Sequence, residues 1–577
     1  MSRVGEILKA VGDFGPFQKR LVLITVLPCL SVAFHQFCQL FMVPNVPHHC
    51  DTSWIRAVGP NLTEEEQLNL TLPRDADGAY ERCSRYSPVG WDLGSILAYG
   101  LNATEGCRDG WVYPSAQPPS LLTEFDLVCD RKDLHDISQS VYMLGLFLGS
   151  LVFGPLSDRI GRRPVILISI LLQGLFGLGT AFVPHFYVYM AFRCVVGASV
   201  TGITMTLLSL AAEWIGVSQR PKAVLISHCC FAIGEMILAG LSYGIRHWRL
   251  LQIAGSAPIF AFLFYMRVLP ESARWLWWRG HKCPNTGSPP SPCPGEMFTP
   301  RKLLVTKLLG WAPRANQSCP WVPSACFDSL AFYLLKLKPE IQSKPGSVLD
   351  LFRKKHLRKV TLIMSCTWFA DSLAYYGLSL NLTNFGLDIY LTQLAFGAVE
   401  IPSRIVCIFI LQWFGRKKTQ AFLLLLSGLV CLVITGIPED QPVVTTVLAI
   451  IGKFTASAAF STSYVYSAEL FPTVLRQTGL GMCSMSARLS GILAPLVLLL
   501  DQYHPAIPMA ILGSVPVVVG LLCFLLPETR GTELADDTGD THPPAEVREN
   551  ANSSSEKGHV KGKDGGQDNE CTKTTYF

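Results

Sequence analysis

Residues 154–163 read Gly-Pro-Leu-Ser-Asp-Arg-Ile-Gly-Arg-Arg, a short polar turn between two apolar segments, 139–153 and 164–183. Gly154 and Gly161 let two helix ends approach closely, because glycine has no Cβ. Asp158 suits the start of one helix, and the arginines suit the end of another. Three cations beside an apolar segment also mark the cytoplasmic side of a membrane. This stretch therefore predicts a cytoplasmic turn between two membrane-spanning helices.

Three motifs around this turn recur in the second part of the chain, at an offset of about 255 residues. They are Gly161-Arg162-Arg163 with Gly415-Arg416-Lys417, Glu213 and Arg220 with Glu469 and Arg476, and Pro270-Glu271-Ser272 with Pro527-Glu528-Thr529. Chance could supply one such pair, but three in register indicate two homologous halves. Repeats of this kind are typical of transporters.

The composition is that of a membrane protein. The chain has 577 residues, of which 49% are hydrophobic and 16% are charged, and its mean hydropathy is +0.32. A soluble chain carries nearer 25% charged residues. The apolar residues form blocks of roughly 20, long enough to cross a hydrocarbon core about 30 Å thick. The net charge of +5 comes from short loops, so it indicates orientation and not nucleic-acid binding.

We expect an all-α polytopic membrane protein with about twelve spans in two bundles and both termini in the cytoplasm. The expected order is a cytoplasmic N-terminus (1–20), a first six-helix bundle (21–269), a central cytoplasmic loop (270–359), a second six-helix bundle (360–526) and a disordered cytoplasmic tail (527–577). The predicted spans are 21–42, 139–157, 165–183, 187–209, 223–243 and 249–269, then 360–380, 388–411, 419–437, 443–466, 478–500 and 506–526.

The polar stretch 43–137 follows the first span and contains no further span. If it lies outside the cell, its four cysteines could form two disulfides, whose pairing the sequence leaves open. The stretch also contains three glycosylation sequons, which agree with an extracellular position. The cysteines are Cys50, Cys83, Cys107 and Cys129, and the sequons begin at Asn61, Asn69 and Asn102.

The turn at 154–163 resembles the loop between the second and third helices of the major facilitator superfamily. Three further stretches resemble the organic ion transporters of solute carrier family 22: 124–130, which closes the cysteine-bearing loop, 270–276 and 469–479. Sugar porters share the motif at 270–276 but lack the long first loop. Residues 55–72, 371–377 and the terminal Thr-Tyr-Phe are most similar to the organic anion branch that exchanges urate and nicotinate. Residues 281–329, which are rich in Pro and Cys, depart from the family and fit no zinc site.

The resemblance implies the major facilitator fold and a carrier, not an enzyme, with no cofactor or metal. Its expected activity is the exchange of small organic anions such as urate, nicotinate and other monocarboxylates across the plasma membrane by alternating access, with the apical membrane of epithelia as one option. No phosphate-binding loop is present to support ATP hydrolysis. Two rivals stay open: a carrier of cations or zwitterions such as carnitine, and a receptor-like homologue that does not transport.

Intramembrane charges are the first candidates for a substrate site, because a central Arg, Lys or Asp costs about 2.5–3.5 kcal/mol to insert. Arg488 lies in the middle of the eleventh predicted span, with no acidic residue within one helical turn. A free guanidinium there suits a carboxylate, which it can hold through two parallel hydrogen bonds. The resemblance also implies a cation at this place in anion carriers. The alternative is a structural pair with another helix.

Other intramembrane charges have two interpretations each. Arg404 follows Glu400 by four residues, which predicts either an ion pair or, by family resemblance, a second anion contact in the cavity. Lys453 and Arg193 fit structural roles better, because each lies near small residues where helices pack. Two acids within predicted spans, Glu235 and Asp371, could carry a coupling proton if burial raises their pKa.

Four aromatic residues match positions that line the cavity in the family's anion carriers: Phe231, Tyr375, Tyr376 and Phe460. The alternative is packing against lipid or other helices. Adjacent residues on a helix point about 100° apart, so at most one of Tyr375 and Tyr376 should face the cavity directly.

Charged residues at the cytoplasmic helix ends are expected to form a gate, through ion pairs between the two halves that break when the halves move. The gate candidates are Asp158, Arg162, Glu213, Arg220, Arg416, Glu469 and Arg476. At the end of the C-terminal tail, residues Thr575 to Phe577 either bind a PDZ domain as an added strand or serve no binding role. The expected partners are thus the organic anion, its exchange anion, the bilayer and this PDZ protein, with no nucleic acid.

Overall fold

The computed structural model describes residues 15–44, 46–75, 78–114, 118–215, 220–265, 269–272, 348–438, 440–472 and 475–530. The first 14 residues, most of the predicted central loop, the tail from residue 531 and its C-terminal PDZ motif lie outside the described residues, as does the side chain of Arg220.

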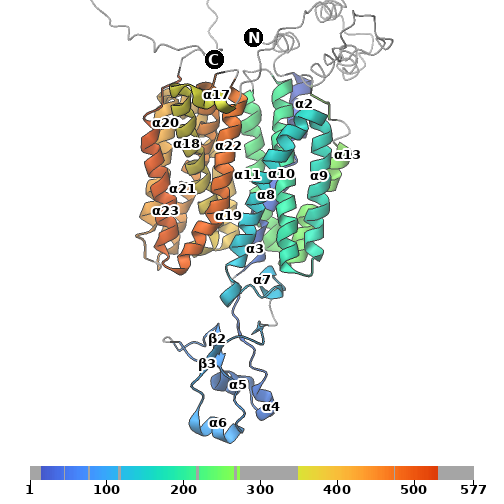
Figure 1. Cartoon of the computed structure of the whole chain (residues 1–577), viewed down its shortest axis with the longest axis vertical. Helices are drawn as coiled ribbons and strands as arrows, with labels where there is room; N and C mark the ends of the chain where they lie inside the picture. Colours follow the sequence, from blue (N-terminus) through green and yellow to red (C-terminus); the bar gives the residue numbers. More distant parts are fainter. Residues whose placement is uncertain are drawn as a thin grey trace, which may run out of the picture. The chain divides into compact units, whose positions relative to one another are not determined.

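Two helical bundles lie side by side, which we call the N half and the C half (Figure 1). The helices of the N half are α2 (Pro16–Val26), α3 (Cys29–Met42), α8 (Leu134–Ile160), α9 (Arg162–Gly179), α10 (Phe186–Trp214), α11 (Arg220–Gly244), α12 (Trp248–Ser256) and α13 (Ile259–Tyr265). Those of the C half are α17 (Val348–Arg353), α18 (Lys355–Leu380), α19 (Ile389–Phe414), α20 (Arg416–Ile434), α21 (Pro442–Leu470), α22 (Arg476–Leu498) and α23 (Ala506–Cys523). Short 3₁₀ turns are η1 (Cys129–Arg131), η2 (Thr180–Phe182), η6 (Leu382–Phe385) and η7 (Leu499–Gln502).

Each predicted span overlaps one of these helices or, for the first and sixth spans, a pair of helices. In the described ranges, ten helices are long and apolar enough to cross a membrane, and Trp248–Phe264 is a shorter apolar helix. The paired helices break at Pro28 and Pro258, because proline lacks the N–H that continues a helix. Ten predicted spans correspond to these ten helices, the sixth corresponds to the shorter one, and the seventh (360–380) falls on α18, which is not among them. The prediction missed both breaks.

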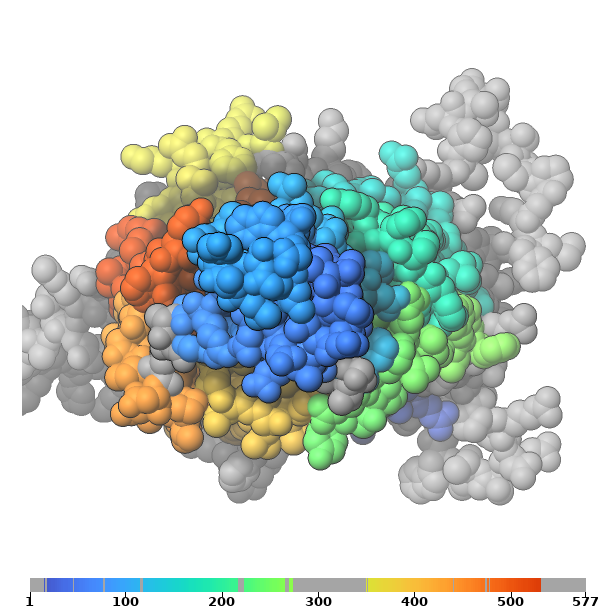
Figure 2. Space-filling view, turned by 90° about the horizontal axis from the view of Figure 1, so that it is seen from below, coloured from blue at the N-terminus to red at the C-terminus, as the bar shows by residue number. Residues whose placement is uncertain are grey.

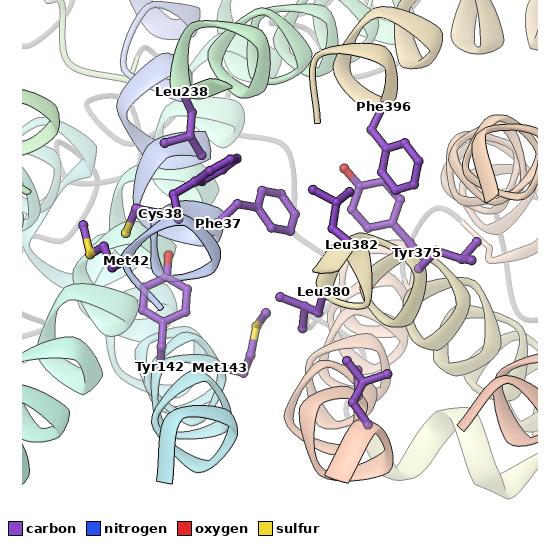
Figure 3. Packing of buried hydrophobic residues seen from close by; sticks show 14 of the residues in the cluster. Phe37, Cys38, Met42, Tyr142, Met143, Leu238, Tyr375, Leu380, Leu382 and Phe396 are labelled. Atoms are coloured by element: carbon purple, nitrogen blue, oxygen red, sulfur yellow. The ribbon is translucent and has the colours of Figure 1, made fainter. Parts of the chain in front are cut away.

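The two halves join along two helix pairs, α8 with α22 and α11 with α19. A single apolar core cluster includes residues from both halves. Figure 3 shows Phe37 of α3 pointing toward Leu382 and Tyr375 across the space between the bundles. Within the N half, α8 and α10 approach so closely that a Cβ at Gly145 would lie 2.1 Å from the carbonyl oxygen of Cys194, as expected where small residues pack between spans.

The described residues of the segment 43–129 form a separate layer at one end of the bundles, which we call the cap, and this end is the cap face (Figure 1). Seen from that side, the cap, in blue, lies over the middle of the face, with helices of both halves around it (Figure 2). The cap contains two short antiparallel strand pairs: β1 (His49–Cys50) with β4 (Trp111–Val112), and β2 (Ser84–Tyr86) with β3 (Thr104–Gly106). Its short helices are α4 (Ile55–Val58), α5 (Glu64–Thr71), α6 (Leu93–Tyr99) and α7 (Leu121–Glu124).

The four cysteines of the cap form the two predicted disulfides, and the structure supplies the pairing: Cys50 with Cys107 and Cys83 with Cys129. All three sequon asparagines are exposed. Glycosylation itself stays a prediction.

The cap is tied to the N half through Glu124. Its carboxylate accepts hydrogen bonds from Trp248 Nε1 at 2.7 Å and from Arg249 Nε at 3.1 Å. Burial alone would raise the pKa of Glu124, but the bonds from Arg249 and Trp248 outweigh it and hold this pKa below its usual range. The carboxylate therefore stays charged near neutral pH, and the attachment holds.

Replacing Cys83 and Cys129 together by serine should loosen the cap. The disulfide spans 46 residues of chain, and closing a loop of that length stabilises a fold by about 4 kcal/mol in the chain-entropy model. We expect limited proteolysis of intact, sealed cells to cut the double variant within the cap much faster than the native protein. Cys366→Ser, which removes an exposed free cysteine of α18, is the control. Equal cleavage of all three proteins would contradict the prediction.

Candidate functional site

Arg488 lies halfway along α22 and points at the other half of the molecule. Its Nη1 donates to the carbonyl oxygen of Leu146 at 3.1 Å and to Thr201 Oγ1 at 2.8 Å, both in the N half. The residue is only partly buried, and these two bonds direct its guanidinium toward the N half. This position between the halves is where transporters of repeated architecture bind substrate.

Tyrosines, not acids, surround this guanidinium. The phenols of Tyr142, Tyr376 and Tyr464 are the titratable groups near it. Within the described ranges, no Asp or Glu forms a salt bridge with Arg488, and its Nε has no hydrogen-bond partner. A cation with unused donors in a largely apolar interior attracts an anion strongly.

An aromatic group on α18 and α21 lies beside Arg488. Three of the four predicted aromatics belong to it: the ring centres of Tyr375 and Tyr376 are 5.3 Å apart, and those of Tyr375 and Phe460 are 6.2 Å apart. Tyr375 is buried whereas Tyr376 is partly exposed, so the two differ as helix geometry requires. The fourth, Phe231, lies on α11 of the N half, with its ring edge against Phe37 at 6.3 Å.

Three members of this group were missed in the sequence. Tyr464 stacks obliquely on Trp368 at 4.3 Å, and the ring of His228 from the N half lies 5.7 Å from Tyr464. The sequence contained a signal for two of them in their helical spacing: Tyr464 follows Phe460 by one turn, and Trp368 precedes Tyr375 by two turns.

A second polar group, which we call the charge cluster, consists of Glu235, Glu400, Arg404 and Lys453. All four residues are at most 3% exposed. Arg404 Nη2 lies 2.6 Å from Glu400 Oε2, and Lys453 Nζ lies 2.9 Å from Glu400 Oε1. Of the two interpretations of Arg404, the structure therefore contains the ion pair. Two cations and two carboxylates balance, as buried charges must.

Glu235 joins this cluster from the N half, whereas the other three residues belong to the C half. Its Oε1 lies 3.9 Å from Lys453 Nζ. The hydroxyl of Tyr375 lies 3.2 Å from the same Glu235 oxygen and 2.5 Å from Glu400 Oε1. Lys453 also donates to Ser379 Oγ at 2.6 Å, and its Nζ lies 3.5 Å from the centre of the Tyr375 ring.

The remaining buried charges lie within one half each. Arg193 donates to the carbonyl oxygen of His35 at 2.8 Å and to Gln139 Oε1 at 2.9 Å, all in the N half. This favours the structural role predicted for it. Asp371 accepts hydrogen bonds from Ser463 and, at 3.2 Å, from Gln420, all in the C half. Whether Asp371 or Glu235 carries a proton stays a prediction.

Five of the expected gate residues form equivalent ion pairs in the two halves, and we call these ion pairs the braces. Arg162 bonds Glu213 at 3.0 Å and Asp158, and Arg416 bonds Glu469 at 3.0 Å. Each of these pairs joins helices of the same half, and ion pairs between the halves stay a prediction. Motif spacing places such residues at helix ends but does not say which neighbouring helix end they meet. Arg476 stands at the start of α22.

The braces also explain the recurring acidic motifs. Glu271 accepts from the backbone N–H of Arg162 at 2.8 Å, at the start of α9, and Glu528 accepts from the N–H of Arg416 at 2.8 Å, at the start of α20. A carboxylate there satisfies free N–H groups and complements the helix dipole. The two halves thus share one construction, as the 255-residue offset predicted.

Comparisons with known proteins agree with this architecture. The profile of the Major Facilitator Superfamily matches residues 132–495 and 360–554. Solute carrier family 22 member 13 from Homo sapiens is 48% identical over 94% of this chain and 93% of its own length. Solute carrier family 22 member 6 from Oryctolagus cuniculus is 37% identical over 93% of each chain. The inward-open xylose transporter XylE from E. coli superposes with a TM-score of 0.57 at 16% identity, over 90% of this chain and 98% of that one, which speaks for the fold alone.

Proposed function

We propose, from the premise that this chain belongs to solute carrier family 22 of the major facilitator superfamily, that it exchanges small organic anions across the plasma membrane. Alternating access of the two halves moves one anion in and another out. The substrates we propose are urate, nicotinate and similar monocarboxylate-like anions. The cap face, with its disulfides and exposed sequons, is then extracellular, and the braces are cytoplasmic.

One observation carries the proposal: the guanidinium of Arg488 stands between the halves without a carboxylate partner among the described residues. A bound anion supplies the missing negative charge and accepts hydrogen bonds from the N–H groups that Arg488 leaves unused. Aromatic rings of the substrate can stack on the partly exposed Tyr376, Phe460 and Tyr464. Arg404 contributes less as an anchor than the resemblance implies, since Glu400 already neutralises it.

Labelled urate, nicotinate and an organic cation, offered side by side to cells preloaded with candidate exchange anions, test the proposal. We expect saturable uptake of at least one of the two anions, stimulated by anion inside the cell, and none of the cation. Cation or carnitine uptake without anion uptake would favour the cation-carrier rival. Absence of any stimulated flux in cells with surface-expressed protein would favour the receptor-like rival.

A further inference from the structure

We infer that Glu235 is an anion-sensitive latch: it holds the N half to the C half at the cap side while the cavity is empty, and it releases when an organic anion enters. The inference rests on the proposed function. It assigns to one residue the coupling that makes a carrier an exchanger.

The charges of each half show why Glu235 belongs to a latch. Without it, the C-half part of the cluster contains two cations, Arg404 and Lys453, and one carboxylate, Glu400. Glu235 supplies the fourth charge from α11 across the boundary between the halves. If the halves separate here, one buried positive charge is left unbalanced, which is costly in a membrane interior. The empty protein therefore resists opening on this side.

The contacts of Glu235 are the looser ones, so it is the member that can leave. Glu400 holds its two cations at 2.6 and 2.9 Å, whereas Glu235 lies 3.9 Å from Lys453. Its hydrogen-bond partners are neutral groups: the hydroxyl of Tyr375 at 3.2 Å and Gln393 Nε2 of α19 at 3.5 Å. The close pairs are all inside the C half, and the weak one crosses to the N half.

A bound anion can act on this latch because the two polar groups are close. The ring of Tyr376 lies 5.3 Å from the ring of Tyr375, whose hydroxyl contacts both Glu235 and Glu400. A Cβ at Gly491, three residues after Arg488 on α22, would lie 3.6 Å from the same Tyr376 ring. A negative charge held at Arg488 therefore repels Glu235 and attracts Lys453 through a medium of low dielectric constant. The bound anion also balances the positive charge of the cluster when Glu235 moves away. A cation would strengthen the latch instead, so the device favours anions.

Other contacts between the halves lie further toward the cap face and would open after the latch. Tyr390 at the start of α19 stacks on Phe41 at 5.4 Å and accepts a hydrogen bond from Arg246 Nη1 at 2.8 Å. These contacts are exposed at their polar end, so water can replace them at little cost. The buried Glu235–Lys453 pair is the contact that water does not replace.

The first test compares two fluxes in proteoliposomes containing the full-length protein. Efflux of labelled nicotinate is measured into buffer with unlabelled nicotinate (exchange) and into buffer without anion substrate (net flux). In the native protein, exchange should exceed net flux. In Glu235→Gln, which removes the charge but keeps the shape, the ratio of exchange to net flux should fall at least about fivefold, the lower end of typical coupling energies.

Asp388→Asn is the control, because it neutralises a carboxylate whose hydrogen-bond partners among the described residues all lie in the C half, at the start of α19, and asparagine can still cap that helix. Its ratio should equal the native one. Tyr375→Phe removes the hydroxyl beside Glu235 with little risk to folding, and should lower the ratio in the same direction by less. A native ratio in both Glu235→Gln and Tyr375→Phe would overturn the latch.

A second readout needs no transport. Leu382 is 1% exposed and points into the space between the halves (Figure 3), so a cysteine placed there should react slowly with an impermeant maleimide applied from the cap side. Without anion, Glu235→Gln should speed this reaction relative to the native background, with the parent lacking the new cysteine as blank. If the native protein exchanges no nicotinate, the proposed function fails while this rate still decides on the latch. Equal rates with and without Glu235 would refute it.

Discussion

Uptake of labelled nicotinate should fall by about 100-fold in Arg488→Ala at equal surface expression. The variant removes the guanidinium that stands between the halves, and loss of one partner of a buried charge pair costs about 2–5 kcal/mol. Arg488→Lys should retain part of the activity, because it keeps the charge and loses the fork of donors that fits a carboxylate. Initial rates over a range of substrate concentrations measure both effects.

Arg488 also binds the N half, so its loss could act through structure instead of substrate. Thr201→Val separates the two causes. It removes the hydroxyl that accepts from Nη1 at 2.8 Å and leaves the positive charge in place. We expect Thr201→Val to transport within a few-fold of the native rate. Native-like anion uptake in Arg488→Ala would show that the guanidinium is not the substrate anchor. Cation uptake gained by Arg488→Glu would favour the cation-carrier rival.

The second large effect is expected in stability. Glu400→Gln leaves Arg404 and Lys453 buried with a single, more distant carboxylate, and breaking a buried pair on one side costs about 3–5 kcal/mol. We expect a clear fall in the thermal unfolding midpoint of the detergent-purified protein. The reason is specific to this residue, because Glu400 contacts both cations and accepts from Tyr375.

The double variant Glu400→Gln, Arg404→Gln is the control for that measurement. It removes one charge of each sign, so Lys453 and Glu235 still balance, and its midpoint should lie above that of Glu400→Gln alone. A double variant less stable than the single one would mean that Arg404 is held by Ser461, which it also reaches at 3.0 Å, more than by Glu400.

Local patterns in the sequence carried most of the fold. The 255-residue offset predicted two equivalent halves, and hydrophobic blocks predicted the spans, because both signals can be read from the sequence without knowing which helices pack together. The same holds for the pair of Glu400 and Arg404, which spacing on one helix brings together. The four cap cysteines predicted two disulfides but not their pairing, since four cysteines allow three arrangements.

Contacts between distant helices could not be predicted in the same way. Glu235 and Lys453 are 218 residues apart in sequence, yet their side chains meet at 3.9 Å, which depends on how α11 and α21 pack against α19. For the same reason the brace residues were recognised as charged helix ends, while their individual partners could not be predicted. His228 gave no signal at all, because a single histidine in an apolar span is as often a packed side chain as a lining one.

On the proposed topology, with the cap face outside the cell, the attachment of the cap has a consequence for reagents that bind this protein from outside. The cap is stapled by its own disulfides and fastened through Glu124 to Trp248 and Arg249, which belong to the N half. An antibody fragment that binds only the cap should move with the N half and should not stop the two halves from moving relative to each other. A fragment intended to arrest the carrier has to reach past the cap and grip the loops of both bundles at once.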